Sequence, residues 1–172
     1  MNRASSNSTG KRQVPLGQLE RIVSGGQTGA DRAALDFAVE HGIPHGGWCP
    51  QGRWSEDGEI AAGYALQETP DGDYTQRTEW NVRDSDGTVI FSLRPTLSGG
   101  SKATQDFAER LGKPCLHVSE QVDGTGSAER LCRFIEHHAV RVLNVAGPRA
   151  SSEPGVADFV KQVLVQALCS EP

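Results

Sequence analysis

Residues 19–42 read LERIVSGGQTGADRAALDFAVEHG, and they carry the clearest fold signal in the chain. The apolar pair at 22–23 runs into two glycines, which is typical of a short buried strand that ends in a tight turn. Residues 30–41 have the apolar spacing of a helix. Asp31 lies in its first turn, where a carboxylate suits the helix dipole, and Gly42 follows its last turn. The stretch therefore predicts a strand, a glycine-rich turn and a helix.

The same alternation returns in the second half of the chain. Its predicted strands cover 88–93, 114–118 and 140–147, and its predicted helices cover 101–111, 128–138 and 156–169. Strands that alternate with helices favour right-handed crossovers and a parallel sheet that is covered on both faces. We therefore predict an α/β fold, a Rossmann-like three-layer sandwich with a mostly parallel sheet and helices on both faces.

Between these two regions, residues 43–86 are polar, charged and rich in glycine, and they hold all three tryptophans of the chain. Short helices are predicted around 59–66 and 75–83. Irregular chain of this length inside a compact domain is typical of a lid or a binding loop.

The length of 172 residues suits one domain. We expect residues 1–18, which are mostly polar, to form a disordered arm, and residues 19–170 to form a single ligand-binding domain. The four cysteines and five histidines have no metal-ligand spacing, so no metal site is expected from them.

Charge and hydropathy narrow the range of partners. The net charge of −5 argues against nonspecific binding of nucleic acid or of an anionic membrane. No apolar run is long enough to span a bilayer, and the first fifteen residues lack the apolar core of a secretory signal. We therefore expect a cytoplasmic protein that binds neither nucleic acid nor a membrane.

Glycine-rich loops occur at three places where a predicted strand meets a predicted helix. They read SGGQTGAD at 24–31, LSGGSKAT at 97–104 and AGPRASSEPG at 146–155. In a parallel sheet such loops gather at the carboxyl edge of the strands, where open α/β folds bind ligands. Glycine lets the backbone approach a ligand, and the helix that follows supplies free N–H groups and the positive end of its dipole. The three loops therefore predict a site for a small phosphorylated ligand.

The candidate ligand-binding residues are glycines and polar side chains of these loops. They are Gly25, Gly26, Gln27, Thr28, Gly29, Asp31, Gly99, Gly100, Ser101, Lys102, Thr104, Gly147, Arg149 and Ser151. Neither a Walker A loop nor a GxGxxG fingerprint is present, so the loops do not specify the ligand. Asp31 either favours the helix start or bonds a ribose hydroxyl or a base edge. Arg149 and Lys102 are either solvated or bound to phosphate, Arg149 through a bidentate fork.

Acidic side chains of the middle segment are candidate catalytic residues. WCPQGRWSEDGEI at 48–60 contains Glu56 and Asp57, and YTQRTEWNVRDSDGT at 74–88 contains Asp84 and Asp86. With arginines beside them, these carboxylates form either a solvated, salt-bridged surface or an active-site lid. In a lid, one of them would act as a base or hold a metal.

Five segments, taken in order, span residues 22–168. They read IVSGGQTGADRAALDFA at 22–38, GGWCPQGR at 46–53 with EDG at 56–58, YTQRTEWNVRDSDGT at 74–88, LSGGSKAT at 97–104 with FAERLGKP at 107–114, and NVAGPRASSEPGV at 144–156. Together they resemble the family of putative molybdenum carrier proteins, also described as the circularly permuted YpsA-like branch of the SLOG superfamily. The resemblance implies a Rossmann-like sheet and a nucleotide-type ligand, with a homo-oligomer as the expectation at family level.

The superfamily includes molybdenum cofactor carriers and phosphoribohydrolases. The hydrolases carry a PGGxGTxxE motif, whereas LSGGSKAT has no glutamate at the matching place, which counts against their activity. Molybdenum cofactor (molybdopterin) and nucleotides both combine a phosphate with a heteroaromatic ring, so the resemblance leaves the cofactor open. We therefore expect a carrier or sensor for a phosphate-bearing heteroaromatic ligand. The alternative is a hydrolase that acts on a nucleotide or a nucleotide derivative.

Overall fold

A computed structural model describes residue 14 and residues 18–169 of the chain. At its centre the described residues form a five-stranded sheet in the order β2-β1-β9-β7-β8, and every neighbouring pair is parallel. The strands are β1 (Arg21–Val23), β2 (His45–Gly46), β7 (Gly87–Ser92), β8 (Cys115–Ser119) and β9 (Val142–Ala146). Since strands close in sequence are joined through helices, their carboxyl ends share one edge of the sheet.

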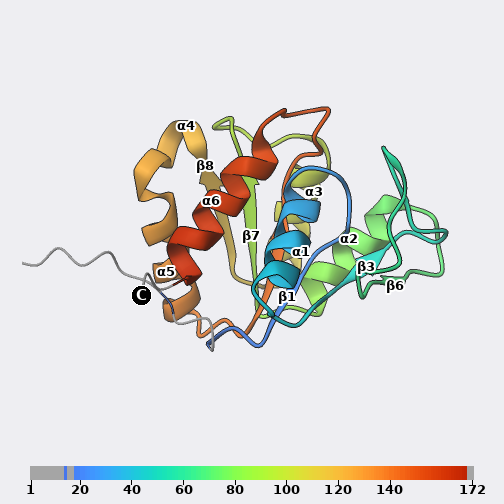
Figure 1. Cartoon of the computed structure of the whole chain (residues 1–172), viewed down its shortest axis with the longest axis horizontal. Coiled ribbons are helices and arrows are strands. Elements are labelled where there is room, and N and C mark those ends of the chain that lie inside the picture. The colour runs from blue at the N-terminus through green and yellow to red at the C-terminus, as the bar shows by residue number, and fades with distance from the viewer. Residues whose placement is uncertain (1–13, 15–17, 170–172) are drawn as a thin grey trace, which may run out of the picture.

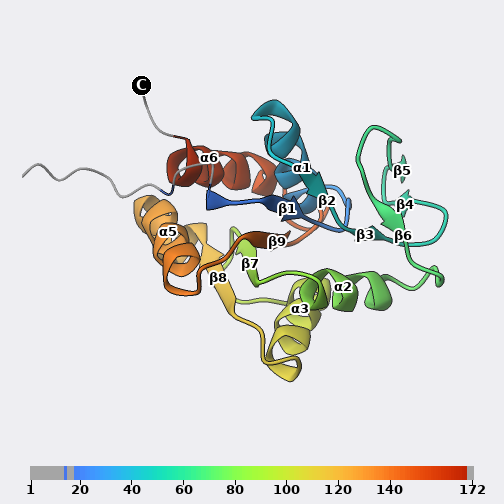
Figure 2. The same ribbon diagram turned by 90° about the horizontal axis from the view of Figure 1, so that it is seen from below.

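Helices cover both faces of this sheet (Figures 1 and 2). One face carries α1 (Ala30–Glu40), α5 (Ser127–His137) and α6 (Val156–Leu168), and the other carries α2 (Tyr74–Arg83) and α3 (Gly99–Arg110). The short helix α4 and a 3₁₀ turn join β8 to α5; they are Glu120–Asp123 and Gly124–Gly126. The fold is therefore a Rossmann-like three-layer α/β sandwich, as the alternating pattern predicts.

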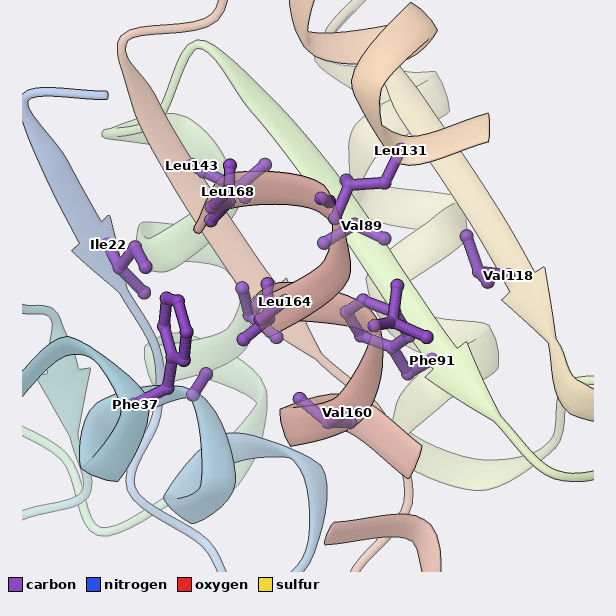
Figure 3. Close-up of a cluster of buried hydrophobic side chains, with 14 of the residues drawn as sticks. Ile22, Phe37, Val89, Phe91, Val118, Leu131, Leu143, Val160, Leu164 and Leu168 are labelled. Carbon is purple, nitrogen blue, oxygen red and sulfur yellow. The ribbon is translucent and has the colours of Figure 1, made fainter. Parts of the chain in front are cut away.

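The main hydrophobic core lies between the sheet and the layer of α1, α5 and α6. Phe37 of α1 and Leu164 of α6 pack there with Ile22, Val89 and Phe91 from the strands (Figure 3). Successive residues of a strand point to opposite faces, so the other β7 side chains face α2 and α3. The apolar cluster on that second face is smaller and polar residues take part of its area, which leaves room for a cavity.

The middle segment folds as a set of short strands beside the sheet, next to α2 (Figure 2). β3 (Trp48–Cys49) pairs in parallel with β6 (Gln67–Glu68), and β4 (Trp54–Ser55) forms a hairpin with β5 (Gly58–Glu59). The tip of this hairpin, residues 55–58, reaches the edge of the sheet where the strands end.

The predicted helix over 75–83 is confirmed as α2, but the predicted helix over 59–66 is wrong. The guanidinium of Arg53 donates hydrogen bonds of 2.8–3.2 Å to four backbone carbonyls between residues 60 and 66. A helix would use those carbonyls internally, so this tertiary contact holds the segment as a loop. Tyr64 fixes it further by donating a hydrogen bond to Asp36 of α1. Burial and this contact raise the pKa of Tyr64 to about 12.

Val14 departs from the expectation of a disordered arm over 1–18. Its side chain is fully buried in the main core, and its N–H donates to the carbonyl of Ala167 at 2.9 Å. Val14 therefore packs with the domain, whereas residues 1–13 and 15–17 lie outside the described part of the chain. Within residues 18–169, no helix combines the length and apolar character needed to cross a membrane.

Candidate ligand-binding site

A cavity of about 500 Å³ opens at the carboxyl edge of the sheet, between the ends of the strands and helices α2 and α3. The three glycine-rich loops meet there, as expected for loops that follow parallel strands. The predicted residues that line it are Gly25, Gln27, Asp31, Gly99, Gly100, Ser101, Thr104, Gly147, Arg149 and Ser151. Ten of the fourteen candidate ligand-binding residues therefore share one cavity.

The other four candidates lie outside this lining. Thr28 and Gly29 border a shallower hollow beside α1 and α6. Gly26 packs against Ile60 and Leu66 of the middle segment. Lys102 lies on the exposed side of α3, where it forms an ion pair with Asp106. This pairing favours the solvated alternative for Lys102.

The glycines of the first and third loops make room for protein atoms. A Cβ at Gly25 would lie 1.5 Å from Nη1 of Arg77, and a Cβ at Gly147 would lie 2.5 Å from the carbonyl oxygen of Phe91. Gly29 has a φ of 81°, and a Cβ there would lie 2.5 Å from the carbonyl oxygen of Pro148. Among the glycines that line the cavity, Gly99 and Gly100 are the two at which an added Cβ would meet no described protein atom within 4 Å. A ligand that approaches the backbone closely would therefore explain the glycines of the second loop, but not those of the first and third loops.

The helix N-termini differ in the same way. At α1, the N–H of Ala30 donates to the carbonyl of Pro148 at 3.2 Å, and the N–H of Thr28 donates to the Gln27 side chain at 3.1 Å. At α3, the side chain of Ser98 makes no capping hydrogen bond. The first N–H groups of a helix have no partner within the helix, and Gly100 and Ser101 of this turn line the cavity. The α3 N-terminus therefore offers N–H groups at the cavity to an anion.

Arg77 of α2 is a lining residue that sequence reasoning missed. Its Nη1 donates to Oδ2 of Asp31 at 2.8 Å, and the two side chains are 14% and 6% exposed. Its Nε is buried and has no hydrogen-bond partner among the described residues. The pair joins α2 to the start of α1 across 46 positions of sequence, so no local motif marks it. Asp31 therefore helps to hold the cavity together as well as facing it.

Arginine side chains supply the positive charge of the cavity. Among the described residues, Arg77, Arg94 and Arg149 are the ones that line it. Arg94 is exposed and has no ion-pair partner in the described part of the chain. Arg149 is 46% exposed and lies 4.0 Å from a carboxylate oxygen of Glu56. Arg94 and Arg149 are thus available to a ligand, whereas Arg77 is already paired.

Hydrogen bonds of Glu56 attach the β4–β5 hairpin to the first and third glycine-rich loops. Its carboxylate accepts hydrogen bonds from the hydroxyls of Thr28 and Ser151 and from the N–H of Ser151, the last at 3.2 Å. These hydrogen bonds lower the pKa of Glu56 from its ordinary value. Its own N–H donates to Oε1 of Gln27 at 2.9 Å. Glu56 therefore lies at the rim of the cavity and connects the hairpin to both loops.

None of the four candidate catalytic carboxylates is a lining residue of the cavity, and the three besides Glu56 are held by other partners. Asp57 pairs with Arg32 at 3.3 Å, and a hydrogen bond from Ser55 lowers its pKa. Asp84 pairs with Arg83 at 2.7 Å, which lowers the pKa of Asp84, and it also accepts a hydrogen bond from the Trp48 indole.

Asp86 lies at the opposite edge of the sheet. Its Oδ2 accepts hydrogen bonds from the N–H groups of Arg141 and Val142, at 3.0 and 2.7 Å, where β9 begins. The placement of Asp84 and Asp86 is therefore against a catalytic role in this cavity. The sequence held a signal for Asp86, because a residue two positions before a predicted strand belongs to the amino edge.

Polar side chains that line the cavity come from strands, helices and loops. Ser92 at the end of β7 is buried, and its hydroxyl lies 2.6 Å from Nε2 of His117 and donates to the carbonyl of Arg94. Glu153 accepts a hydrogen bond from the N–H of Leu93 at 2.6 Å. Other polar lining residues that sequence reasoning missed are Thr78, Asn81, Thr96 and Asn144. Their contribution depends on how α2 and α3 pack on the sheet.

Comparisons with known proteins agree with this architecture. A crystal structure from Syntrophus aciditrophicus SB, named as a putative molybdenum carrier protein, is 47% identical and superposes with a TM-score of 0.82. The match covers 88% of this chain and 96% of that protein. A comparison with curated proteins found no match. The profile of the circularly permutated YpsA SLOG family matches residues 22–168, which contain the whole sheet except the first residue of β1. The chain therefore belongs to the circularly permutated YpsA SLOG family.

Proposed function

We propose that this protein is a carrier or sensor that binds a small phosphate-bearing molecule in the cavity at the carboxyl edge of the sheet. The observation that carries the proposal is the convergence of Arg94, Arg149 and the free N-terminus of α3 on one cavity. The whole chain has a net charge of −5, so an anionic ligand needs such a local concentration of positive groups.

The two kinds of positive group suit different parts of a phosphorylated ligand. Guanidinium groups form charge-assisted, bidentate hydrogen bonds with phosphate oxygens. The N–H groups of Gly100 and Ser101 add fixed donors and the positive end of the helix dipole. A cavity of about 500 Å³ has the size of a small-molecule site and is large enough for a phosphate with a bicyclic ring.

The carboxylates favour a binding role over the alternative of a hydrolase. A general base has to reach the reacting atom within hydrogen-bond distance. Asp31 is held by Arg77, Glu153 by a backbone N–H, and Glu56 by Thr28 and Ser151. Each of these groups already accepts hydrogen bonds that fix it in the protein, so binding requires less rearrangement than catalysis.

Molybdenum cofactor and nucleotides are the two ligand classes that fit these residues. The relative from Syntrophus aciditrophicus SB is named as a putative molybdenum carrier protein. Molybdenum cofactor combines a pterin ring with a phosphate. A buried amide donor at Gln27, without an acceptor among the described residues, adds a group that suits a polar ring. As cargo, such a ligand would place its phosphate at Arg94, Arg149 and the α3 N-terminus.

Native mass spectrometry and calorimetry test the proposal. Protein purified without added ligand should retain a phosphorylated small molecule, and Arg149→Ala should weaken its binding. A bidentate charge-assisted bond contributes about 1.5–3 kcal/mol, so the expected loss is on the order of ten- to a hundred-fold. Arg149→Lys should recover part of the loss, because the charge remains but the fork does not.

Arg110→Ala is the matched control, since Arg110 is exposed on the same domain and pairs with Glu79 outside the cavity. It should leave the affinity unchanged. If wild type and Arg149→Ala distinguish equally between phosphorylated and dephosphorylated forms of the ligand, Arg149 does not hold the phosphate. If nucleoside phosphates are converted to products, the hydrolase alternative replaces the carrier.

A further inference from the structure

Gln27 has an amide side chain whose orientation is fixed by the backbone around it. Its Oε1 accepts hydrogen bonds from the N–H groups of Thr28 at 3.1 Å and Glu56 at 2.9 Å. Two donors on one side of the amide require the oxygen there, because an amide nitrogen cannot accept them. The other side of the amide is therefore Nε2, which is a donor.

This donor has no acceptor within the described part of the protein. Nε2 of Gln27 is buried, the residue is only 5% exposed, and it lines the cavity. An unpaired buried donor is costly, and groups of this kind are rare unless a ligand or water completes them. The amide therefore presents its N–H groups to whatever occupies this wall of the cavity.

Asp31 presents an acceptor beside this donor. Its Oδ2 is taken by Arg77 at 2.8 Å and by the N–H of Gln27 at 3.3 Å. Its Oδ1 has no partner among the residues that the structure describes, and Asp31 also lines the cavity. The backbone N–H of Gln27 donates to Asp31 Oδ2, and both residues line the cavity, so the two side chains project from neighbouring points of one wall.

We infer that Gln27 and Asp31 recognise a lactam edge on the ring of the ligand, in which a ring carbonyl stands next to a ring N–H. The Gln27 amide donates to the carbonyl, and the free oxygen of Asp31 accepts from the N–H. Guanine, hypoxanthine and the pterin ring all have this edge. The inference rests on the proposed function, which places the phosphate of the ligand at the arginines. It concerns the ring of the same ligand.

Adenine has the opposite order along the corresponding edge, an amino donor followed by a ring-nitrogen acceptor. With its phosphate end in the same place, it sets a donor against Gln27 and an acceptor against Asp31. A site that leaves its buried polar groups unpaired rejects such an analogue strongly. The protein should therefore distinguish two purine nucleotides of the same size and charge.

Binding of GMP, IMP, AMP and neopterin monophosphate, measured by calorimetry, tests this inference. Wild type should bind the lactam compounds at least ten-fold more tightly than AMP. A stronger response to neopterin monophosphate than to GMP identifies the ring as a pterin, and the reverse order identifies it as a guanine-type base. Equal affinities for GMP and AMP would overturn the inference whatever the variants do.

Substitutions at Gln27 separate recognition of the ring from binding of the phosphate. Gln27→Met keeps the length of the side chain but removes the donor, so the preference over AMP should disappear. Gln27→Glu replaces the donor with an acceptor and should shift the preference toward AMP. Gln162→Met, at an exposed position of α6, is the matched control and should keep the wild-type preference. Retained preference in Gln27→Met would refute the role of this amide.

The experiment also distinguishes this inference from the proposed function. If GMP and AMP bind equally well and both lose affinity in Arg149→Ala, the phosphate site stands and the ring assignment is wrong. If none of the four phosphorylated compounds binds, both proposals are refuted.

Discussion

Replacing Gly25 with alanine tests how the Asp31–Arg77 ion pair is held in the cavity wall. The new Cβ would lie 1.5 Å from Nη1 of Arg77 and 2.9 Å from Oδ2 of Asp31. Gly25 itself has no positive φ, so the backbone accepts alanine and the strain falls on the guanidinium. That group can swing into the cavity, which leaves Asp31 buried with the Gln27 N–H as its remaining partner.

The size of the effect follows from the loss of this pair. Breaking a buried ion pair by removing one partner costs about 3–5 kcal/mol, and the freedom of Arg77 to reach solvent reduces this to about 2–3 kcal/mol. For a chain of this length, that corresponds to a decrease of about 4–12 °C in Tm. Urea unfolding followed by circular dichroism measures the change in the free energy of unfolding directly.

A double-mutant cycle with Arg77→Met identifies the cause. In the wild-type background Arg77→Met should cost about 3–5 kcal/mol, because it removes the partner of the same carboxylate altogether. In the Gly25→Ala background it should cost about 2 kcal/mol less, which gives a coupling energy of about 2 kcal/mol. Gly63→Ala is the control, since a Cβ there meets no described atom within 4 Å. Additive effects, or a Gly25→Ala cost no larger than the control, would refute this explanation of the glycine.

Three further predictions concern the hairpin, the loop and the core. Because its pKa is lowered, Glu56 stays ionised above pH 4.5, the ordinary value, and holds the hairpin against the two loops. Its hydrogen bonds to Thr28 and Ser151 should be lost as the pH falls through the lowered pKa. Hydrogen exchange of residues 54–59, corrected for the intrinsic rate, should then accelerate in wild type but not in Glu56→Gln. Arg53→Lys offers fewer donors to the loop carbonyls and should speed chymotryptic cleavage at Tyr64; an unchanged rate would contradict this. Val14→Ala should destabilise the protein by about 2 kcal/mol in urea unfolding, whereas an exposed arm residue would have no effect.

The fold could be predicted from the sequence because its signals are local. β1, β7, β8 and β9 contain short apolar runs, and α1, α3, α5 and α6 have apolar faces, so the order of these elements can be taken from neighbouring residues. The place of the site follows from the same pattern, because loops after parallel strands must share an edge. Asp86 follows this rule too, since it precedes β7 and lies at the amino edge.

Contacts between distant segments could not be predicted in this way. Arg77 meets Asp31 across 46 positions, and the charge pattern around it gives no partner. The loop over 60–66 has helix-compatible residues, but the hydrogen bonds from Arg53 hold its carbonyls in another arrangement. The glycines of the first loop were predicted to let the backbone approach a ligand, whereas the atoms that lie closest to Gly25, Gly26 and Gly29 belong to the protein.

The middle segment supplies the part of the site that the α/β repeat lacks. The loops after the strands provide glycines, hydroxyls and Arg149. These groups suit a phosphate but do not distinguish one ring from another. The backbone N–H of Glu56 orients the Gln27 amide, and Arg77 holds one oxygen of Asp31 so that the other is free. Both contacts come from residues 43–86. Phosphate binding should therefore depend on the repeating frame of the fold, whereas the choice of ring should depend on how this segment packs against it. Damage to the hairpin should weaken discrimination between rings before it weakens affinity for phosphate.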